Sequence, residues 1–397
     1  MYKPKSDLLK QLYIRGYIHQ CTNIEKLDQI AEKKRVVGYI GFDCTGESLH
    51  VGSLIQLMLI RIMQKTGNQT IVLLGSGTSK IGDPSGKDKA RQLLEENIIK
   101  SNSISIKKNI EKFCINNSNL PKVKFVDNSL WLNDINYIKW LREYGKFFSV
   151  NKMLTMDSVS ERLKRKQSLS FLEFNYMVFQ AYDFFQLNNR ENCSVQFGGS
   201  DQWGNIISGV DLIRRINKKE TFGLTTPLIT TSSGEKMGKT NKGSIWLDEN
   251  LLSSDGYWQF WRNVDDKDVI KFLKLFTELN IEKIKKLKNQ STNEINQNKK
   301  LLADEATKLC HNKIEKDICV LKKKYIKNGL EAFEIVSINK KIINSKSDAR
   351  RLIRGGAVKF NGKLIKDELE KISEKNLSNN KIEVSVGKKN HFTIHII

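Results

Sequence analysis

A histidine and a glycine stand at the start of a predicted helix, where a chain can bind phosphate. The run His50-Val51-Gly52-Ser53 follows an apolar stretch and a short turn. The first amides of a helix are unpaired and its dipole is positive there, so anions bind. A histidine can donate to phosphate oxygens whose charge grows in a transition state, and a glycine lets an adenine ring approach the backbone. Alone, this pattern also fits a histidine that simply packs at a helix start.

Two lysines far downstream could bind the phosphates of the same nucleotide. The run Glu235 to Thr240, EKMGKT, lies between Gly and Ser residues and is predicted to be a mobile loop. Lys236 and Lys239 could close over a triphosphate and neutralise the pyrophosphate that leaves. Exposed lysine pairs are common, so this run indicates a nucleotide site only in combination with the first run.

A glycine-rich stretch between the two runs fits neither of the familiar nucleotide motifs. Residues 75–87 read GSGTSKIGDPSGK. A P-loop needs four residues between its first glycine and the Gly-Lys pair, and the interval from Gly82 to Lys87 is one residue short and is followed by Asp88. A dinucleotide fingerprint needs a third glycine where Lys80 stands. Both motifs are therefore excluded.

The elements that must position these residues alternate between strands and helices. Residues 35–43 are predicted to be a buried strand, followed by an apolar-periodic helix over residues 48–64. Further strands are predicted at 69–74, 123–126 and 193–197, interleaved with helices over 172–187 and 201–216. This alternation is typical of the α/β class with a parallel sheet.

The rest of the chain reads as two further parts. Residues 253–327 are helical in pattern and rich in lysine, and a polar joint near residues 339–345 precedes short helical and strand-like runs. We therefore expect a catalytic domain over 1–230, a helical domain with the lysine loop over 231–330, and a small α+β module over 337–397.

Composition narrows the class of protein. The formal charge of +23 favours a polyanionic partner such as nucleic acid, although lysines on solvated faces would give the same total. No apolar run approaches the ~18 to 20 residues of a membrane span, and the N-terminus reads as a cytosolic start rather than a signal. The six cysteines form no C-x-x-C pair, so neither disulfides nor a metal site is predicted.

The two runs together, in this order and separation, resemble the signature motifs of class I aminoacyl-tRNA synthetases. Four intervening blocks are similar to the bacterial-type tyrosyl members: YIGFDCTGESLHVGS (39–53), GTSKIGDPSGK (77–87), EFNYMVFQAYDFF (173–185) and QFGGSDQWGNI (196–206). SKSDARRLIRGGAVKFNGKLI (345–365) resembles the RNA-binding module at that family's C-terminus. The resemblance covers nearly the whole chain and implies a Rossmann-like catalytic domain, followed by a helical domain and the small RNA-binding module.

The resemblance implies a tyrosine site that the residue chemistry also supports. Tyr39 and Asp183 offer a donor and acceptor pair to a phenol, and phenylalanine would leave them unpaired. Strong discrimination against phenylalanine without editing is already known for this enzyme family. Tyr176 and Gln180 share one helix face with Asp183. In the family they hold the substrate ammonium together with Asp83, which could otherwise only cap a turn. The implied tyrosine-binding set is completed by Gln196, otherwise readable as a core amide, and Gln202.

The resemblance also implies an ATP site. Thr45 and His50 would bind the γ-phosphate in the transition state, with Lys236, Lys239 and Thr240 from the loop. The implied adenylate-binding residues are Gly41, Asp43, His50, Gly52, Ser53, Gly199, Asp201 and Lys239. Two departures from the family pattern are Ser53, where a histidine is usual, and Gly238, where many class I enzymes have serine. A serine hydroxyl can still bond a ribose oxygen.

The resemblance therefore implies tyrosine activation by ATP with Mg²⁺, transfer to tRNA(Tyr), a homodimer and a cytoplasmic enzyme without a tightly bound cofactor. Two alternatives stay open on sequence alone. One is tryptophanyl-tRNA synthetase, against which Tyr39, Asp183 and the C-terminal module argue. The other is a catalytically idle relative that binds structured RNA, against which His50, Lys236 and Lys239 argue.

The C-terminal module carries four cations at helical spacing: Lys346, Arg350, Arg351 and Arg354. Residues three to four apart can share one helix face. Gly355-Gly356 is predicted to stop this helix, and Asn361-Gly362 to form a hairpin turn. A helix and ribbon of this kind could grip an RNA backbone, and the alternative is a solvated basic helix.

Overall fold

In the computed structural model, the chain forms two compact units, Met1–Leu252 with Asp265–Asn298, and Ser253–Val264 with Lys299–Ile397. The structure describes residues 2–85, 93–232, 234, 237–240, 243–287, 291–311, 318–327, 329–339, 342–343, 345–377, 381–387 and 390–396. Each unit is described by itself below.

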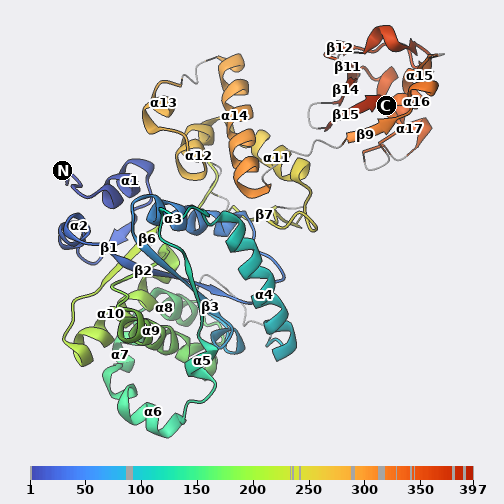
Figure 1. The fold of residues 1–397 in the computed structure, drawn as a ribbon. Coiled ribbons are helices and arrows are strands. Elements are labelled where there is room, and N and C mark those ends of the chain that lie inside the picture. The colour runs from blue at the N-terminus through green and yellow to red at the C-terminus, as the bar shows by residue number, and fades with distance from the viewer. Residues whose placement is uncertain are drawn as a thin grey trace. The chain divides into compact units, whose positions relative to one another are not determined.

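The first unit is built around a six-stranded sheet in the order β1-β6-β5-β2-β3-β4 (Figure 1). The five strands from β6 to β4 pair in parallel, and only β1 runs antiparallel, at the edge. The strands are β1 Gln20–Cys21, β2 Val37–Asp43, β3 Gln69–Gly75, β4 Lys124–Asp127, β5 Val195–Gly199 and β6 Phe222–Thr226. The order reverses between β2 and β5, and ligands of open parallel sheets bind outside the carboxyl ends of the strands at such a point.

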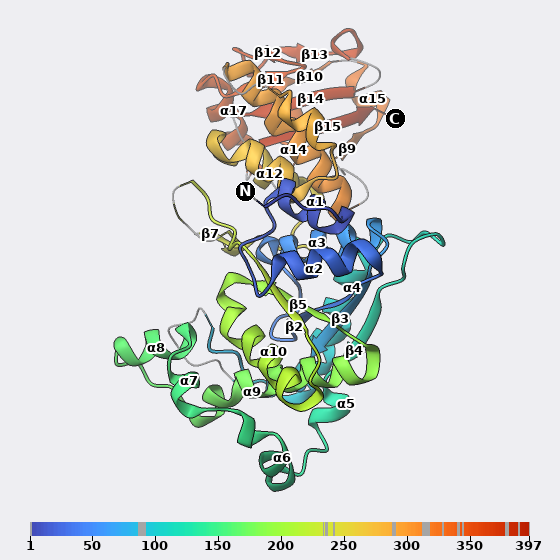
Figure 2. The same cartoon turned by 90° about the vertical axis from the view of Figure 1, so that its left-hand side faces the viewer.

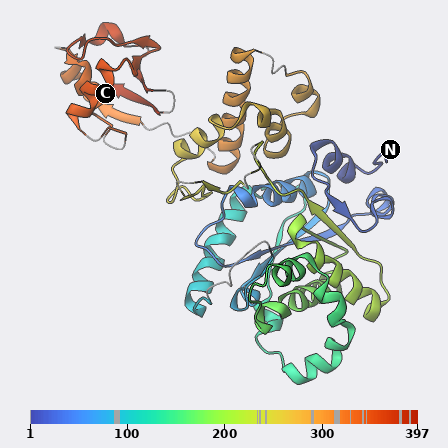
Figure 3. The ribbon, with the colours of Figure 1, turned by 180° about the vertical axis from the view of Figure 1, so that it is seen from behind.

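Helices cover both faces of this sheet. Figure 1 shows α3 and α4 over one face, and Figure 3 shows α9 and α10 side by side over the other. The bounds are α1 Asp7–Arg15, α2 Ile24–Lys33, α3 Leu54–Lys65, α4 Glu96–Phe113, α9 Phe171–Glu191 and α10 Trp203–Asn217. The long helix α9 begins at a capping box, in which Ser170 and Glu173 exchange side-chain bonds to backbone amides. Because both faces are covered, the central strands are buried nearly throughout.

Four short helices follow one another between β4 and α9, and two of them, α7 and α8, lie side by side (Figure 2). The four are α5 Ser129–Leu132, α6 Tyr137–Glu143, α7 Val150–Leu154 and α8 Asp157–Lys164. The unit also contains a two-stranded ribbon, β7 Lys239–Thr240 with β8 Gly243–Ser244, and the helices α12 Val269–Phe276 and α13 Ile281–Lys285. No helix among the described residues is long and apolar enough to cross a membrane.

The second unit holds a five-stranded sheet in the order β12-β11-β14-β15-β9. Its strands are β9 Ile318–Leu321, β11 Val358–Phe360, β12 Lys363–Leu364, β14 Lys381–Val386 and β15 Asn390–Ile396, with a separate pair β10 Leu330–Glu331 and β13 Lys371–Ile372. Its helices are α11 Ser254–Arg262, α15 Lys323–Ile326, α16 Ala332–Val336 and α17 Lys346–Arg354; α14 Thr292–His311 begins in the first unit.

The predicted α/β class and a small α+β module are confirmed, and the predicted strands and long helices of the first unit fall within a few residues of β2, β3, β4, β5, α9 and α10. The predicted helix over 48–64 begins as a 3-10 turn at Val51–Ser53 before α3. The hairpin turn is also confirmed, since Asn361 and Gly362 have φ of 47° and 82° between β11 and β12.

One prediction is wrong: the helical pattern does not continue from 253 to 327. Residues Ile318–Leu321 form β9, which pairs in parallel with β15. This run, ICVL, is short, apolar and flanked by lysines, so its character as a strand depends on a partner more than seventy residues away. Ile326 and the buried residues of α16 then share one hydrophobic cluster with residues 343–396. The core of the C-terminal module therefore begins before the predicted joint at 339–345.

Candidate functional site

The site lies where the strand order of the first sheet reverses. Tyr39 on β2 and Gln196 on β5 are direct neighbours in the register of these strands. Both side chains are buried at 1% exposure, and the Tyr39 hydroxyl and the Gln196 Oε1 atom have no hydrogen-bond partner. An unpaired buried polar group costs free energy unless a ligand satisfies it. Two such groups on neighbouring strands are therefore candidates for contact with a ligand.

Asp183 supplies a carboxylate next to the Tyr39 hydroxyl. It lies on α9 at 2% exposure and accepts hydrogen bonds from Asn128 Nδ2 at 3.0 Å and Trp131 Nε1 at 2.7 Å. Burial raises the pKa of Asp183 to about 7, against the lowering effect of these two donors. Burial, and then the charge of Asp183, raise the pKa of Tyr39 well above its ordinary value. The pocket thus ends in a phenol and a carboxylate that influence each other.

Asn128 and Trp131 were missed by the sequence reasoning. They follow β4 directly, at the carboxyl end of a parallel strand, and that position was a usable signal. The Asn128 side chain also donates to Thr78 Oγ1 at 3.0 Å and accepts from the Gly77 amide at 2.8 Å. It therefore orients Asp183 from a rigid support.

Acceptor oxygens line the next stretch of the pocket. The Tyr176 hydroxyl donates to Asp43 Oδ2 at 2.9 Å, so its oxygen lone pairs remain as acceptors. Burial raises the pKa of Tyr176 well above its ordinary value, as does the charge of Asp43. The Gln180 amide oxygen accepts from Asn205 at 2.9 Å. Both oxygens act as acceptors or keep acceptor lone pairs, which is the chemistry that a bound cation needs.

A second chain of bonds joins Asp83 to α10. Asp83 is buried, and its carboxylate accepts from the Ser85 amide at 2.9 Å and from Gln202 Nε2 at 2.8 Å. The Gln202 oxygen accepts in turn from Asn205 at 3.2 Å. Three of the predicted tyrosine-binding residues, Asp83, Gln180 and Gln202, are therefore connected through Asn205, a residue that the sequence reasoning did not single out.

Glycines open the path between this pocket and the first signature run. Gly41 on β2 is exposed, and a Cβ atom there would meet nothing within 4 Å. Asp43 ends the same strand and accepts from Thr78 Oγ1 at 2.9 Å, and Thr45 is exposed in the following loop. Across the sheet, a Cβ atom on Gly199 would lie 2.6 Å from Asp201 Oδ1, so a side chain there would displace the Asp201 carboxylate.

The two signature runs meet in space. His50 Nδ1 accepts the Gly52 amide hydrogen at 3.0 Å, which leaves the proton of a neutral ring on Nε2. A Cβ atom on Gly238, which has φ of +125°, would lie 2.9 Å from His50 Nδ1. Met237 O would lie 3.2 Å from a Cβ atom on Gly52. Ser53 precedes α3 without a side-chain cap bond. Glycine at 238 is thus explained by this close approach.

The predicted loop side chains are only partly described. Lys236 lies outside the described residues, as do the side chains of Lys239 and Thr240, whose backbones form β7. Downstream of them, His50 forms a β-bridge with Trp246, and the Val51 amide donates to Ile245 O at 2.8 Å. The backbone that carries the second run is therefore anchored on the first.

The four predicted RNA-binding cations lie in the second unit, on α17. Three form ion pairs: Lys346 with Glu334 at 3.0 Å, Arg351 with Asp348 at 2.6 Å, and Arg354 with Glu368 through two bonds. The Arg350 guanidinium stacks on the Phe333 ring at 4.0 Å. These surface pairs are weak and can exchange for phosphate. The helix ends at Arg354 as predicted, before Gly356 with φ of +66°.

Comparison with known proteins agrees with this geometry. Residues 31–319 match the family model described as tRNA synthetases class I (W and Y). The chain is similar to the tyrosine–tRNA ligases of Pelagibacter ubique, at 48% identity over 99% of this chain and 100% of the relative, and of Ehrlichia ruminantium, at 49% identity over 99% and 98%.

Solved structures show the same relationship. A C-terminally truncated mitochondrial tyrosyl-tRNA synthetase of Aspergillus nidulans is similar with a TM-score of 0.69 and 30% identity, over 77% of this chain and 90% of that chain. The tyrosyl-tRNA synthetase of Archaeoglobus fulgidus shares the fold with a TM-score of 0.57 at 17% identity, over 77% and 100%. The tryptophan enzyme and the idle relative are not favoured. The chain belongs to the class I tyrosyl-tRNA synthetases, the tyrosine–tRNA ligases.

Proposed function

We propose that the pocket between β2, β5 and α9 binds tyrosine with its phenol between Tyr39 and Asp183. The single observation that carries this proposal is the buried Tyr39 hydroxyl without a hydrogen-bond partner, beside a carboxylate whose pKa is raised to about 7. A phenol donates to Asp183 and accepts from Tyr39, so it satisfies both groups. A phenylalanine ring would satisfy neither.

The substrate ammonium then lies among acceptor oxygens. Asp83, Tyr176 and Gln180 offer these, and the hydrogen of Tyr176 is committed to Asp43. Gln196 and Gln202 complete the tyrosine site. The unpaired Gln196 oxygen gives this role a physical reason, since a buried amide oxygen needs a donor.

We assign the ATP side to the glycine-lined path and the two signature runs. Gly41, Asp43, Gly52, Ser53, Gly199 and Asp201 would hold the adenosine part, and Thr45, His50, Lys236, Lys239 and Thr240 the β- and γ-phosphates. The tyrosine carboxylate attacks the α-phosphorus in line, and pyrophosphate leaves with the electron pair of the broken P–O bond. Positioning and charge stabilisation carry this step, without a covalent nucleophile from the protein.

Magnesium enters as part of the substrate, bound to ATP. Among the described residues, no group of three or more His, Cys, Asp or Glu side chains could hold a metal ion. Mg²⁺ prefers phosphate oxygens and water as ligands, which suits an ion that arrives with ATP. In the second half-reaction, a ribose hydroxyl at the 3′ end of tRNA(Tyr) attacks the tyrosyl carbonyl and AMP is released.

Tyr39→Phe tests the pocket without removing its aromatic ring. We expect kcat/KM for tyrosine to fall by a factor that corresponds to ~1 kcal/mol of transition-state stabilisation, the contribution of one hydrogen bond. Because the ring and its packing on Phe184 remain, thermal stability should change little. Tyrosine-dependent ATP–pyrophosphate exchange, run in parallel with phenylalanine, measures both activity and selectivity. Unchanged kinetics with both amino acids would remove Tyr39 from the pocket.

We propose a division of labour between a catalytic domain over 1–230, a lysine loop with a helical domain over 231–330, and an RNA-binding module over 337–397. The cations Lys346, Arg350, Arg351 and Arg354 support the last role. Because Ile326 and α16 share the module's hydrophobic cluster, the module is best removed as a whole by a cut after His311.

Truncation after His311 should separate the two half-reactions. We expect adenylate formation to stay within about twofold, while tRNA charging falls at least about a hundredfold and the salt dependence of tRNA affinity decreases, since phosphate contacts are lost. Exchange and charging assays on the same preparation measure both. Equal loss of both activities would indicate a structural module, and full charging would show that RNA binds elsewhere.

We also propose a homodimer that works in the cytoplasm. Nine of the nineteen large hydrophobic side chains that are exposed among the described residues lie between positions 130 and 172, on α5 to α9. Exposed apolar residues gathered in this way are typical of an interface. None of the six cysteines, all of which are among the described residues, forms a disulfide, which suits a reducing compartment. Sedimentation equilibrium would test the dimer directly, and a monomer mass would contradict it.

A further inference from the structure

The backbone that leads into the second signature run is held by the first turn of α12. Asp268, at 4% exposure, accepts a hydrogen bond from the Ser232 amide at 2.7 Å. Lys271 Nζ donates to the Thr230 carbonyl at 2.8 Å. Both contacts reach backbone groups four to six residues before the first signature lysine. They therefore fix where the run begins rather than any one side chain in it.

The Asp268 side chain does not cap the helix that it precedes. It is the N-cap residue of α12, where an aspartate ordinarily accepts from an amide of its own helix. Its side chain makes no such cap bond and bonds Ser232 instead. A bond from an amide to a carboxylate is among the stronger hydrogen bonds. The Asp268 carboxylate therefore binds the segment before the second signature run, while the 3-10 turn that leads into α12 is capped by Asp265.

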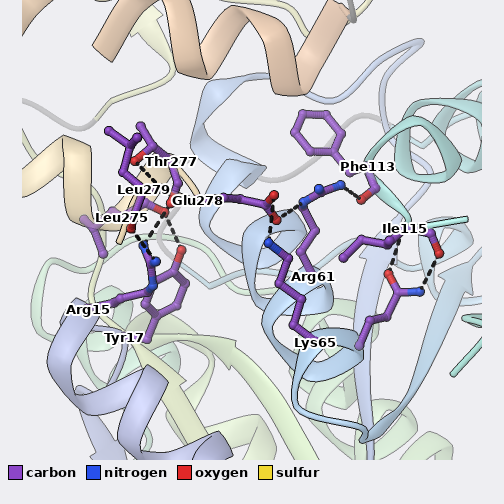
Figure 4. A network of polar contacts seen from close by, with 11 residues as sticks. Arg15, Tyr17, Arg61, Lys65, Phe113, Ile115, Leu275, Thr277, Glu278 and Leu279 are labelled. Atoms are coloured by element: carbon purple, nitrogen blue, oxygen red, sulfur yellow. Dashed lines mark hydrogen bonds and ion pairs between the residues drawn. The ribbon is translucent and has the colours of Figure 1, made fainter. Parts of the chain in front are cut away.

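The other end of α12 is fixed to the body of the first unit, as Figure 4 shows. The Arg15 guanidinium donates to the carbonyls of Lys274, Thr277 and Leu279 at 2.9 to 3.0 Å, and the Tyr17 hydroxyl donates to Leu275 O. These contacts come from the N-terminal segment that begins with α1. They satisfy the carbonyls at the C-terminal end of α12, which have no partner within the helix.

The C-terminal end of α12 is also bonded to α3, the helix that follows the first signature run. Glu278 accepts from Arg61 at 2.7 Å and pairs with Lys65 at 2.8 Å, and both cations lie on α3. Burial raises the pKa of Glu278, but its bonds to Arg61 and Lys65 outweigh this and hold the pKa below its ordinary value. The α12 segment therefore connects the second half of α3, the helix that follows the first run, with the approach to the second run.

The backbone is also held between the two signature lysines, at Met237, and downstream of them, at Leu247. The Met237 amide donates to Ile229 O at 2.8 Å, and the Leu247 amide donates to Leu49 O at 2.9 Å. The described backbone before and after the lysines is thus anchored at separate places. The downstream anchor is the first signature run itself, and the upstream anchor is α12.

We infer that Asp268, assisted by Lys271, is a positioning residue for tyrosine activation: it fixes the backbone from which Lys236 and Lys239 reach the leaving pyrophosphate. The inference rests on the proposed role of these lysines. A preorganised cation stabilises a transition state only if its support is rigid, and displacement by about 1 Å can cost about a hundredfold in rate.

Asp268→Ala should lower kcat for ATP–pyrophosphate exchange about tenfold while KM for tyrosine stays within twofold. Asp265→Ala is the matched control, because the Asp265 side chain accepts from the Lys267 amide in its own turn and, among the described residues, makes no bond to residues 230–232. Asp268→Asn keeps an acceptor oxygen for Ser232 and should recover most of the activity. Lys271→Met should show a smaller loss than Asp268→Ala. Thermal unfolding of each variant is measured alongside, so that a general loss of stability is visible.

A double-mutant cycle with Lys236→Ala separates positioning from stability. If Asp268 acts through the lysine, Asp268→Ala should cost less than about twofold in the Lys236→Ala background. Losses that multiply in full, or an Asp268→Ala variant with wild-type kcat, would overturn the inference. A Lys236→Ala variant with full activity would instead overturn the lysine's proposed role, and the inference with it. The two failures are therefore distinguishable.

Discussion

Asp183→Ala should reduce kcat/KM for tyrosine by at least about a thousandfold. The substitution removes the acceptor of the substrate phenol and leaves Asn128 Nδ2 and Trp131 Nε1 without their partner. Losing a hydrogen bond to a charged group costs ~1.5 to 3 kcal/mol, and the two buried donors that lose their acceptor add to this cost. Exchange kinetics with tyrosine measure the loss. Activity within tenfold of wild type would remove Asp183 from the proposed site.

Two controls distinguish this effect from general destabilisation. Asp28 is also a buried aspartate, bonded to Ser6 and to the Lys5 amide outside the pocket, so Asp28→Ala should lower thermal stability without changing KM for tyrosine. The second control is pH. Because the pKa of Asp183 is raised to about 7, its carboxylate becomes protonated as pH falls below 7 and loses an acceptor for the phenol. Wild-type KM for tyrosine should therefore rise on acidification, and the alanine variant should lack this step.

The double variant Lys236→Ala with Lys239→Ala should slow adenylate formation by about 10² to 10⁴ while the tyrosine dissociation constant stays within twofold. Removal of one group that stabilises transition-state charge typically costs 10² to 10³ in rate. The lysines act on the departing pyrophosphate, so the ground-state complex with tyrosine does not depend on them. Rapid-quench measurement of a single turnover gives the rate, and equilibrium dialysis gives tyrosine binding.

Lys219→Ala is the matched control for this pair, because Lys219 is exposed at the end of α10 and away from both signature runs. It should leave the rate unchanged. If the double variant instead weakened only tyrosine binding, the lysines would be ground-state contacts and the proposed mechanism would be wrong about them.

The parts of this fold that sequence reasoning anticipates are those that local pattern determines. The strand β2, the helix α9 and the turn at Asn361-Gly362 each follow from a run of residues whose character is visible without a partner. The strand β9 is the counterexample. Its four residues lie in a lysine-rich stretch, and only pairing with β15 makes them a strand.

The same distinction holds for the site. Tyr39, Asp183 and the signature runs are recognisable in the sequence, whereas the hydrogen bonds of Asn128 and Trp131 to Asp183 span more than fifty residues. The internal ion pairs on α17 depend on Glu334 and Glu368, which lie twelve and fourteen residues from their partners. Asp268 has no local signature at all, since its capping position is ordinary and only the fold brings Ser232 to it.

The most direct test of the proposed pocket is ATP–pyrophosphate exchange by the full chain with tyrosine, phenylalanine and tryptophan as separate substrates. Tyrosine alone satisfies the Tyr39 hydroxyl and Asp183 together, so kcat/KM for tyrosine should exceed that for phenylalanine by ~10⁴ to 10⁵, a discrimination already known for this enzyme family and adopted here. Exchange driven equally well by phenylalanine or tryptophan would contradict the assignment of this pocket to a phenol.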